Sequence, residues 1–130
     1  MMKNLWLIAM TCSALLVSCS KEPGEGGRAE IRGLLYEQRY NGSSLQGQPY
    51  PIADARVAII YGDGEYADDD TRTGPNGEFR FAWLRKGDYR LYAISECQSC
   101  PSGEEGVYVD VTITGRKQVV NVGTITIRNY

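Results

Sequence analysis

From Ala29 onward, apolar and polar residues alternate in short segments that Gly, Pro, Asn or Asp bound. The segment 78–83 places Phe79, Phe81 and Trp83 on one side. A period of two is that of a β-strand with one face in a core. No window of a dozen residues carries a helical apolar stripe. Seven strands are therefore predicted, at residues 29–37, 55–61, 69–73, 78–83, 88–96, 106–114 and 118–127.

The number and spacing of these strands predict an all-β protein, a seven-stranded antiparallel β-sandwich. In the last strand, Val120 and Val122 are at even positions, whereas Ile125 and Ile127 are at odd ones, so a regular strand would place the two pairs on opposite faces. A β-bulge at Gly123 would shift the phase by one residue and keep both pairs buried. The predicted core contains Val57, Ile59, Phe79, Phe81, Leu91, Val109 and Val111.

The first 18 residues have the layout of a signal peptide. Lys3 lies in a short polar start, and an apolar stretch follows from residue 5 to residue 17. At about 1.5 Å per residue, a helix of this length does not cross a hydrocarbon core of about 30 Å. We therefore expect residues 1–18 to be removed and not to remain as a membrane helix.

The rest of the chain divides into a tether and one folded domain. Residues 19–28 are rich in Gly and charge and have no apolar periodicity, so they are predicted to be flexible. Residues 29–130 are predicted to form the β-sandwich, and a chain of 130 residues supports one domain at most.

Composition excludes several classes of function. The chain has 14 Lys+Arg against 16 Asp+Glu, a net charge of -2, so it is no cationic nucleic-acid binder. It contains no His, which removes the Ser-His-Asp and Cys-His relays and the HExxH zinc site. We expect a protein without enzymatic activity.

The apolar stretch ends in Leu16-Val17-Ser18-Cys19. This tetrad resembles the lipobox of bacterial lipoproteins. The resemblance implies that the Cys19 thiol is acylated, for example with palmitate, and that Cys19 becomes the first mature residue. It also implies attachment to the bacterial cell envelope, and Ser20 after the Cys is similar to the outer-membrane sorting pattern. The alternative is an ordinary secretory cleavage near Ser18 that leaves Cys19 free.

Four ordered motifs lie in the body of the chain: Ile31-Arg32-Gly33, then residues 51–57 (PIADARV), 73–81 (TGPNGEFRF) and 84–91 (LRKGDYRL). Together they resemble the carboxypeptidase regulatory-like, transthyretin-like (prealbumin-like) β-sandwich. The resemblance implies a Greek-key topology and a scaffold role for the motif residues. Relatives with catalytic or metal chemistry use His, and those with an isopeptide bond use a Lys in the first strand, where this chain has none.

Cys97 and Cys100 form a CxxC motif between two predicted strands. Such a pair is a disulfide, a redox dithiol or half of a zinc site. A zinc ion would lack further ligands here. A redox dithiol typically has its first Cys at a helix N-terminus, whereas this pair lies between two predicted strands. A disulfide that pins the loop in an oxidising compartment is the favoured interpretation, and a redox lipoprotein is the alternative function.

An acidic run contains Asp63, Glu65, Asp68, Asp69 and Asp70. Calcium prefers such oxygen ligands, and mutual repulsion between the carboxylates would fall on binding the ion. A solvated loop without an ion is the alternative, because the spacing does not match an EF-hand. Calcium is the one cofactor that the sequence suggests.

A polar stretch at residues 38–50 is longer than a usual connection, which is typical of a binding loop or a mobile one. Its candidate binding residues are Tyr40, Asn41 and Tyr50. The nine Tyr residues could also form a stacking platform for sugars. We expect a binding or structural accessory module for a protein or glycan partner in the envelope, acting through loops 38–50 and 63–70 and one end of the sandwich.

Overall fold

The computed structural model describes residues 22–130. The predicted signal peptide and Cys19 lie outside the described residues, so both stay predictions. Within residues 22–130 no helix is long and apolar enough to cross a membrane. The strands are β1 (Glu25–Asn41), β2 (Ser44–Pro51), β3 (Arg56–Tyr61), β4 (Asp69–Arg72), β5 (Glu78–Leu84), β6 (Gly87–Glu96), β7 (Glu104–Ile113) and β8 (Val119–Asn129).

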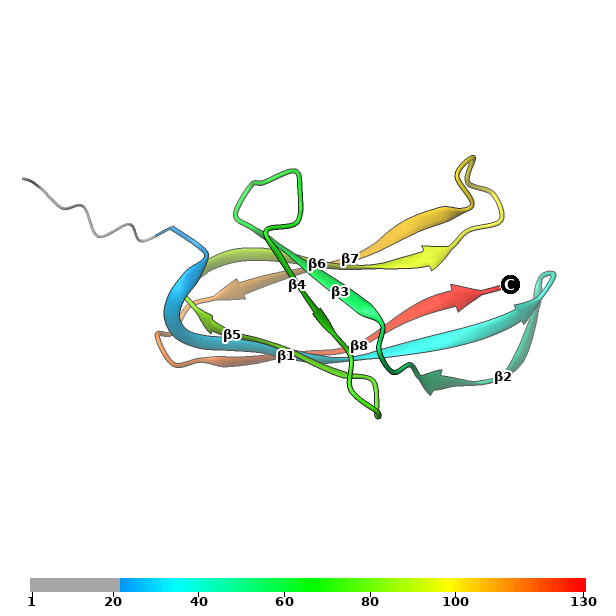
Figure 1. Ribbon diagram of the computed structural model, residues 1–130, viewed down its shortest axis with the longest axis horizontal. Coiled ribbons are helices and arrows are strands. Elements are labelled where there is room, and N and C mark those ends of the chain that lie inside the picture. The colour runs from blue at the N-terminus through cyan, green and yellow to red at the C-terminus, as the bar shows by residue number, and fades with distance from the viewer. Residues whose placement is uncertain (1–21) are drawn as a thin grey trace, which may run out of the picture.

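The eight strands form two sheets that face each other across one core (Figure 1). In the first sheet, β1 pairs with β8 along one edge and with β5 and then β2 along the other. The second sheet has the order β4-β3-β6-β7. The predicted all-β sandwich is confirmed, although it has eight strands and not seven. One pairing, β1 with β8, is parallel, whereas the sequence predicted antiparallel strands throughout.

The additional strand is β2, which arises from the stretch predicted as a long loop. Asn41 pairs with Ser44, and Gly42 between them has φ +61, so the chain reverses in a tight hairpin. Nearly every residue of β2 is exposed. Because neither face of β2 is buried, its sequence lacks the alternation that marks a strand.

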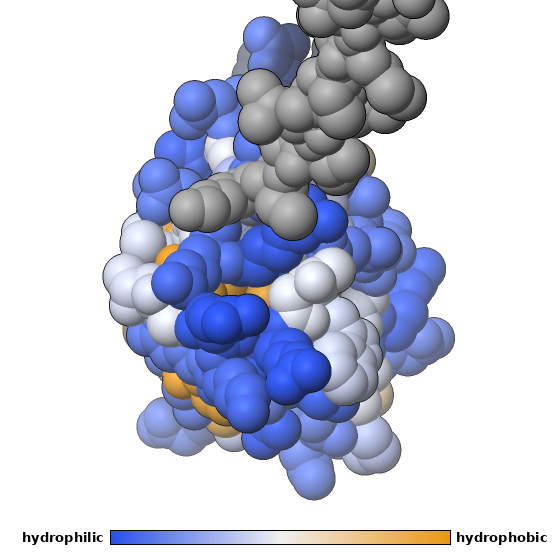
Figure 2. Space-filling view, turned by 90° about the vertical axis from the view of Figure 1, so that its left-hand side faces the viewer, coloured by the Kyte–Doolittle hydropathy of each residue, from blue (hydrophilic) through white to orange (hydrophobic). Residues whose placement is uncertain are grey.

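The core lies between the two sheets. Of the seven predicted core residues, six are buried, and Val109 is partly buried and packs against the others. The buried cluster also includes Ile31 and Leu35 of β1 and Ile125 and Ile127 of β8. Figure 2 looks onto the end at which β1 begins and shows that hydrophilic residues cover most of it.

The predicted placement of Trp83 on the core face is wrong. Trp83 has φ +58 and is 68% exposed, while Leu84 is buried in its stead. The register between β1 and β5 shifts here, since Ala29 pairs with Leu84 and Ile31 with Phe81. The extra residue on β5 is a β-bulge, which moves the next side chain to the core face.

The predicted bulge at Gly123 is confirmed. Arg32 pairs with Asn121 and Leu34 with Thr124, so β8 has one extra residue at this point. Gly123 has φ +77, which glycine adopts without a steric penalty. Residues before and after Gly123 therefore both face the core.

Strand β1 begins before the predicted domain boundary at Ala29. Residues 25–28, which the sequence assigned to the tether, are part of β1. The buried Tyr89 hydroxyl donates to the carbonyl oxygen of Arg85 (2.7 Å) and accepts from the Gly24 N–H (2.8 Å). The Gly24 carbonyl in turn accepts from the Arg85 N–H (2.8 Å). Tyr89 thus joins the start of β1 to the turn between β5 and β6.

The core assignment is tested by comparing Phe81→Ala with Trp83→Ala. We expect Phe81→Ala to lower the free energy of unfolding by about 3–5 kcal/mol, because it removes a buried ring and leaves a cavity. Trp83→Ala should change it by less than about 0.5 kcal/mol, since that ring is exposed. Urea unfolding of both variants measures the difference. Equal losses would contradict the assignment of Phe81 to the core face and Trp83 to the outer face of β5.

Tyr89→Phe tests the hydroxyl that fixes the start of β1. The change leaves the Gly24 N–H and the Arg85 carbonyl without their partner, so we expect a loss of about 1–3 kcal/mol of unfolding free energy. Tyr66→Phe is the matched control, because Tyr66 is 82% exposed. Urea unfolding that finds the two variants equally stable would show that the hydroxyl does not hold this end.

Candidate functional site

The outer face of the second sheet gathers charged and aromatic side chains from four strands. The register of β6 and β7 places Arg90 beside Asp110 and Tyr92 beside Tyr108. On the next strand, the small side chain of Ala58 lies opposite Tyr92. A continuous row of six side chains results, which we call the aromatic ladder: Asp70, Arg56, Tyr92, Tyr108, Arg90 and Asp110.

The centre of the aromatic ladder is a pair of tyrosine rings. The centroids of Tyr92 and Tyr108 lie 5.4 Å apart, within the range of favourable ring contacts. The guanidinium carbon of Arg56 lies 5.9 Å from the Tyr92 ring centroid, and that of Arg90 lies 5.7 Å from the Tyr108 centroid. Both distances fit cation–π contacts, so each ring of the pair has one arginine against it.

A carboxylate holds each of these arginines in place. Arg56 Nε donates to Asp70 Oδ2 at 2.7 Å. Arg90 contacts both carboxylate oxygens of Asp110, at 2.7 Å through Nε and at 3.3 Å through Nη2. A bidentate contact of this kind fixes the plane of the guanidinium group.

Gly106 gives the Tyr108 ring its place on the surface. A Cβ atom at Gly106 would lie 2.6 Å from Cε2 of Tyr108, so a side chain there would displace the ring. Without that side chain the ring packs closely over the backbone of β7. Tyr108 remains 57% exposed, so part of its ring is accessible to a partner.

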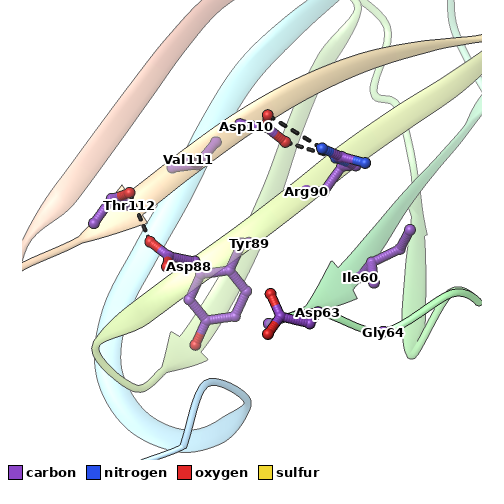
Figure 3. Close-up of a pocket in the computed structure, with 10 residues that line it drawn as sticks. Ile60, Asp63, Gly64, Asp88, Tyr89, Arg90, Asp110, Val111 and Thr112 are labelled. Carbon is purple, nitrogen blue, oxygen red and sulfur yellow. Dashed lines mark hydrogen bonds and ion pairs between the residues drawn. The ribbon is translucent and has the colours of Figure 1, made fainter.

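A pocket of about 440 Å³ adjoins the aromatic ladder (Figure 3). Strands β6 and β7 contribute Asp88, Arg90, Asp110 and Thr112, and the loop after β3 contributes Asp63. The Thr112 hydroxyl donates to Asp88 Oδ1 at 2.8 Å. The pocket thus presents carboxylate acceptors together with one guanidinium donor.

Arg90 stabilises the ionised form of its neighbour Asp110 in this pocket. Its hydrogen bond to Asp110 lowers the pKa of the Asp110 carboxyl below its ordinary value. The same hydrogen bond raises the pKa of Arg90. Both groups are charged at neutral pH, and Asp110 acts as a hydrogen-bond acceptor only.

The acidic run predicted to bind calcium is dispersed over several local contacts. Asp68 Oδ2 accepts the Tyr61 N–H at 2.7 Å, Asp69 Oδ1 accepts the Asp70 N–H at 2.8 Å, and Asp70 pairs with Arg56. Asp63 lines the pocket, and Glu65 is exposed. Within residues 22–130, no three of these five acids bring ligand atoms within 4.8 Å of one another. Calcium binding stays a prediction.

The candidate binding residues of the first sheet lie apart from the aromatic ladder. Tyr40 stacks on Tyr130, with ring centroids 5.1 Å apart. The Tyr50 hydroxyl donates to the Glu37 carboxylate, and this hydrogen bond raises the pKa of Tyr50. Asn41 is the last residue of β1, at the hairpin. Tyr40 and Tyr50 are thus engaged with neighbours in their own sheet.

Cys97 and Cys100 are bonded to each other, with their Cα atoms 5.4 Å apart. They lie in the loop between β6 and β7, where the Cys97 N–H donates to the Gly103 carbonyl at 2.9 Å. Cys97 is buried, and no helix N-terminus stands beside the pair in the described part of the chain. A redox activity of this pair stays a prediction.

Sequence reasoning did not find the aromatic ladder, although a signal for it exists. Residues 88, 90 and 92 alternate with buried residues, and residues 108, 110 and 112 alternate with buried or partly buried ones. Pairing the two segments as an antiparallel hairpin would have placed Arg90 beside Asp110 and Tyr92 beside Tyr108. The contribution of Arg56 depends on the neighbouring strand β3 and has no local signal.

No known family model matches this chain, and no curated protein matches it. Among solved structures, it is similar to a proposed carbohydrate-binding protein of Pseudomonas aeruginosa, with 15% identity, coverage of 82% of this chain and 91% of that chain, and a TM-score of 0.47. A minor pilin of Streptococcus agalactiae has 17% identity, coverage of 84% and 45%, and a TM-score of 0.44.

A DUF3823 family protein of Parabacteroides merdae has 16% identity, coverage of 80% and 46%, and a TM-score of 0.39. The chain thus spans less than half of the pilin and of the DUF3823 protein. At these identities and TM-scores the similarities carry no argument about function, which must come from the site itself.

Proposed function

We propose that this protein is a non-enzymatic glycan-binding module, attached to the bacterial outer membrane through a lipid on Cys19. The observation that carries the proposal is the aromatic ladder beside the polar pocket on the outer face of the second sheet. Envelope localisation is supported by the signal-peptide pattern and by the lipobox resemblance of residues 16–19.

The tyrosine pair suits the apolar face of a sugar ring. A pyranose presents C–H groups on its faces, and these pack on an aromatic ring. The Tyr108 ring lies close over Gly106, and the guanidinium group of Arg90 lies against the ring. A ring that its surroundings already hold loses little conformational freedom when a ligand stacks on it.

The pocket suits the hydroxyl groups at the rim of the same ligand. Sugar hydroxyls donate to carboxylates and accept from guanidinium groups, and Asp63, Asp88, Asp110 and Arg90 supply both kinds of partner. Asp110 and Arg90 are already oriented by their bidentate contact. The alternative ligand of an accessory module is a protein partner that presents hydroxyl-rich or aromatic side chains to the same site.

Binding without hydrolysis is supported by the charge state of the site. Glycoside hydrolysis by two carboxyl groups requires a general acid whose pKa is raised. Arg90 lowers the pKa of Asp110 instead. The sequence also contains no His that could act in place of a carboxylic acid.

We also infer kinship with the carboxypeptidase regulatory-like β-sandwiches, because the motif residues serve the scaffold. The Thr73 hydroxyl accepts the Ala55 N–H (3.0 Å) and donates to the Ile52 carbonyl (2.6 Å), joining the loops before β3 and after β4. Gly77, with φ +76, accepts the Leu35 N–H through its carbonyl at 2.8 Å.

Glycan binding is tested with a chain that begins at Ser20, which keeps the whole core. Binding is measured on a glycan array and on insoluble cellulose, chitin, xylan and peptidoglycan sacculi. We expect Tyr108→Ala to weaken binding at least about tenfold, or about 1.4 kcal/mol, because it removes the exposed ring. Trp83→Ala is the matched control, since it removes an exposed ring from the other sheet. Equal losses in both variants, or no binding to any glycan, would refute the proposal.

Lipid attachment is tested by feeding labelled palmitate to cells that produce the full chain. We expect label in the wild type and none in Cys19→Ala, which should leave the membrane fraction after a high-salt wash. Wild-type chain without label would show that residues 16–19 are an ordinary cleavage site.

A further inference from the structure

The end of the sandwich at which β1 begins carries a concentration of positive charge. A shallow hollow of about 1070 Å³ lies there, and three chain segments meet around it: the start of β1, the turn between β5 and β6, and the turn between β7 and β8. Strongly hydrophilic residues gather at this end in Figure 2. We call its five cations the basic end: Arg28, Arg85, Lys86, Arg116 and Lys117.

These five cations have no acidic partners within the described residues. The four ion pairs found between residues 22 and 130 all involve other arginines. Lys86, Arg116 and Lys117 are exposed, and the Arg85 guanidinium lies close over Gly26, where a Cβ atom would approach Nη2 to 2.8 Å. The glycine thus lets Arg85 fold onto this end and add its charge to that of the other four cations.

The path of the chain places the basic end next to the membrane, if Cys19 carries the proposed lipid. Gly24 is fixed to Tyr89 and Arg85 by hydrogen bonds. Gly24 lies five positions after Cys19 in the sequence, and a fully extended chain covers at most about 3.6 Å per residue. The tether therefore keeps this end within about 18 Å of the bilayer surface. It also lets the end approach to the distance of about 8 Å over which surface charge acts at physiological salt.

We infer that the basic end docks onto the anionic headgroups of the leaflet that holds the lipid anchor. Lys and Arg near such a surface are attracted to its phosphate groups. Docking at this end would direct the β1–β2 hairpin away from the bilayer, because it lies at the opposite end of the long axis (Figure 1). The aromatic ladder would then lie on the side of the molecule, open to a ligand. This inference rests on the proposed function, because the lipid at Cys19 is what brings the basic end close to a bilayer.

The test uses an unlipidated chain that begins at Ser20, so that only the basic end can hold it on a bilayer. Trp83 is the one tryptophan of that chain and lies next to Leu84 of the hollow. Energy transfer from Trp83 to dansyl-labelled headgroups reports docking on phosphatidylcholine vesicles with and without phosphatidylglycerol. We expect binding only with phosphatidylglycerol, reversed by high salt.

The variant Arg116→Gln/Lys117→Gln should bind these vesicles about 30-fold more weakly, because each cation near an anionic surface strengthens binding about fivefold. The control Arg39→Gln/Arg128→Gln removes the same charge from the far ends of β1 and β8 and should bind like the wild type. Equal weakening in both variants would assign the effect to net charge and overturn the inference. Equal binding to both kinds of vesicle, or binding to neither, would also overturn it.

Two further outcomes separate this inference from its premise. Preference for a duplex DNA over the phosphatidylglycerol vesicles would identify a nucleic acid as the partner and reject the membrane. If the palmitate experiment fails while vesicle binding depends on Arg116 and Lys117, the lipid at Cys19 is refuted and the anionic surface stands.

Discussion

The pairing of β1 along both of its edges is the constraint on which the sandwich depends. Three strands, β8, β5 and β2, form their ladders on this one strand, and its inward side chains contribute Ala29, Ile31 and Leu35 to the core. Gly33 leaves space at the crowded centre of this strand. A Cβ atom there would lie 2.5 Å from Phe79 and 2.7 Å from Val122, so the absence of a side chain admits both neighbours.

The second sheet uses its two faces for different purposes. Its inner face provides Val57, Ile59 and Leu91 to the core, which sets the spacing and twist of β3 and β6. With the backbone fixed in this way, the outer residues gain defined positions without having to be buried. The aromatic ladder is therefore organised by contacts between its own members on a support that the core keeps rigid.

The sequence predicted those parts of the fold in which burial of one strand face makes every second residue apolar. Strands β5 and β7 and the Gly123 bulge are of this kind. It did not predict β2, because neither face of that strand is buried. It misplaced Trp83, because a bulky residue at positive φ has no local signature. The aromatic ladder depends on register across four strands, whereas the acidic run and the CxxC motif were visible as local composition.

The parallel pairing of β1 with β8 joins the first strand of the domain to the last. Contacts between segments so distant in sequence are slow to form, because the whole intervening chain must first be closed into a loop. During synthesis, one of the two edges of β1 would stay unpaired until the C-terminal segment emerged from the ribosome. Completion of the sandwich is thereby coupled to arrival of the C-terminal strand, so a chain that stops short of β8 cannot complete the first sheet.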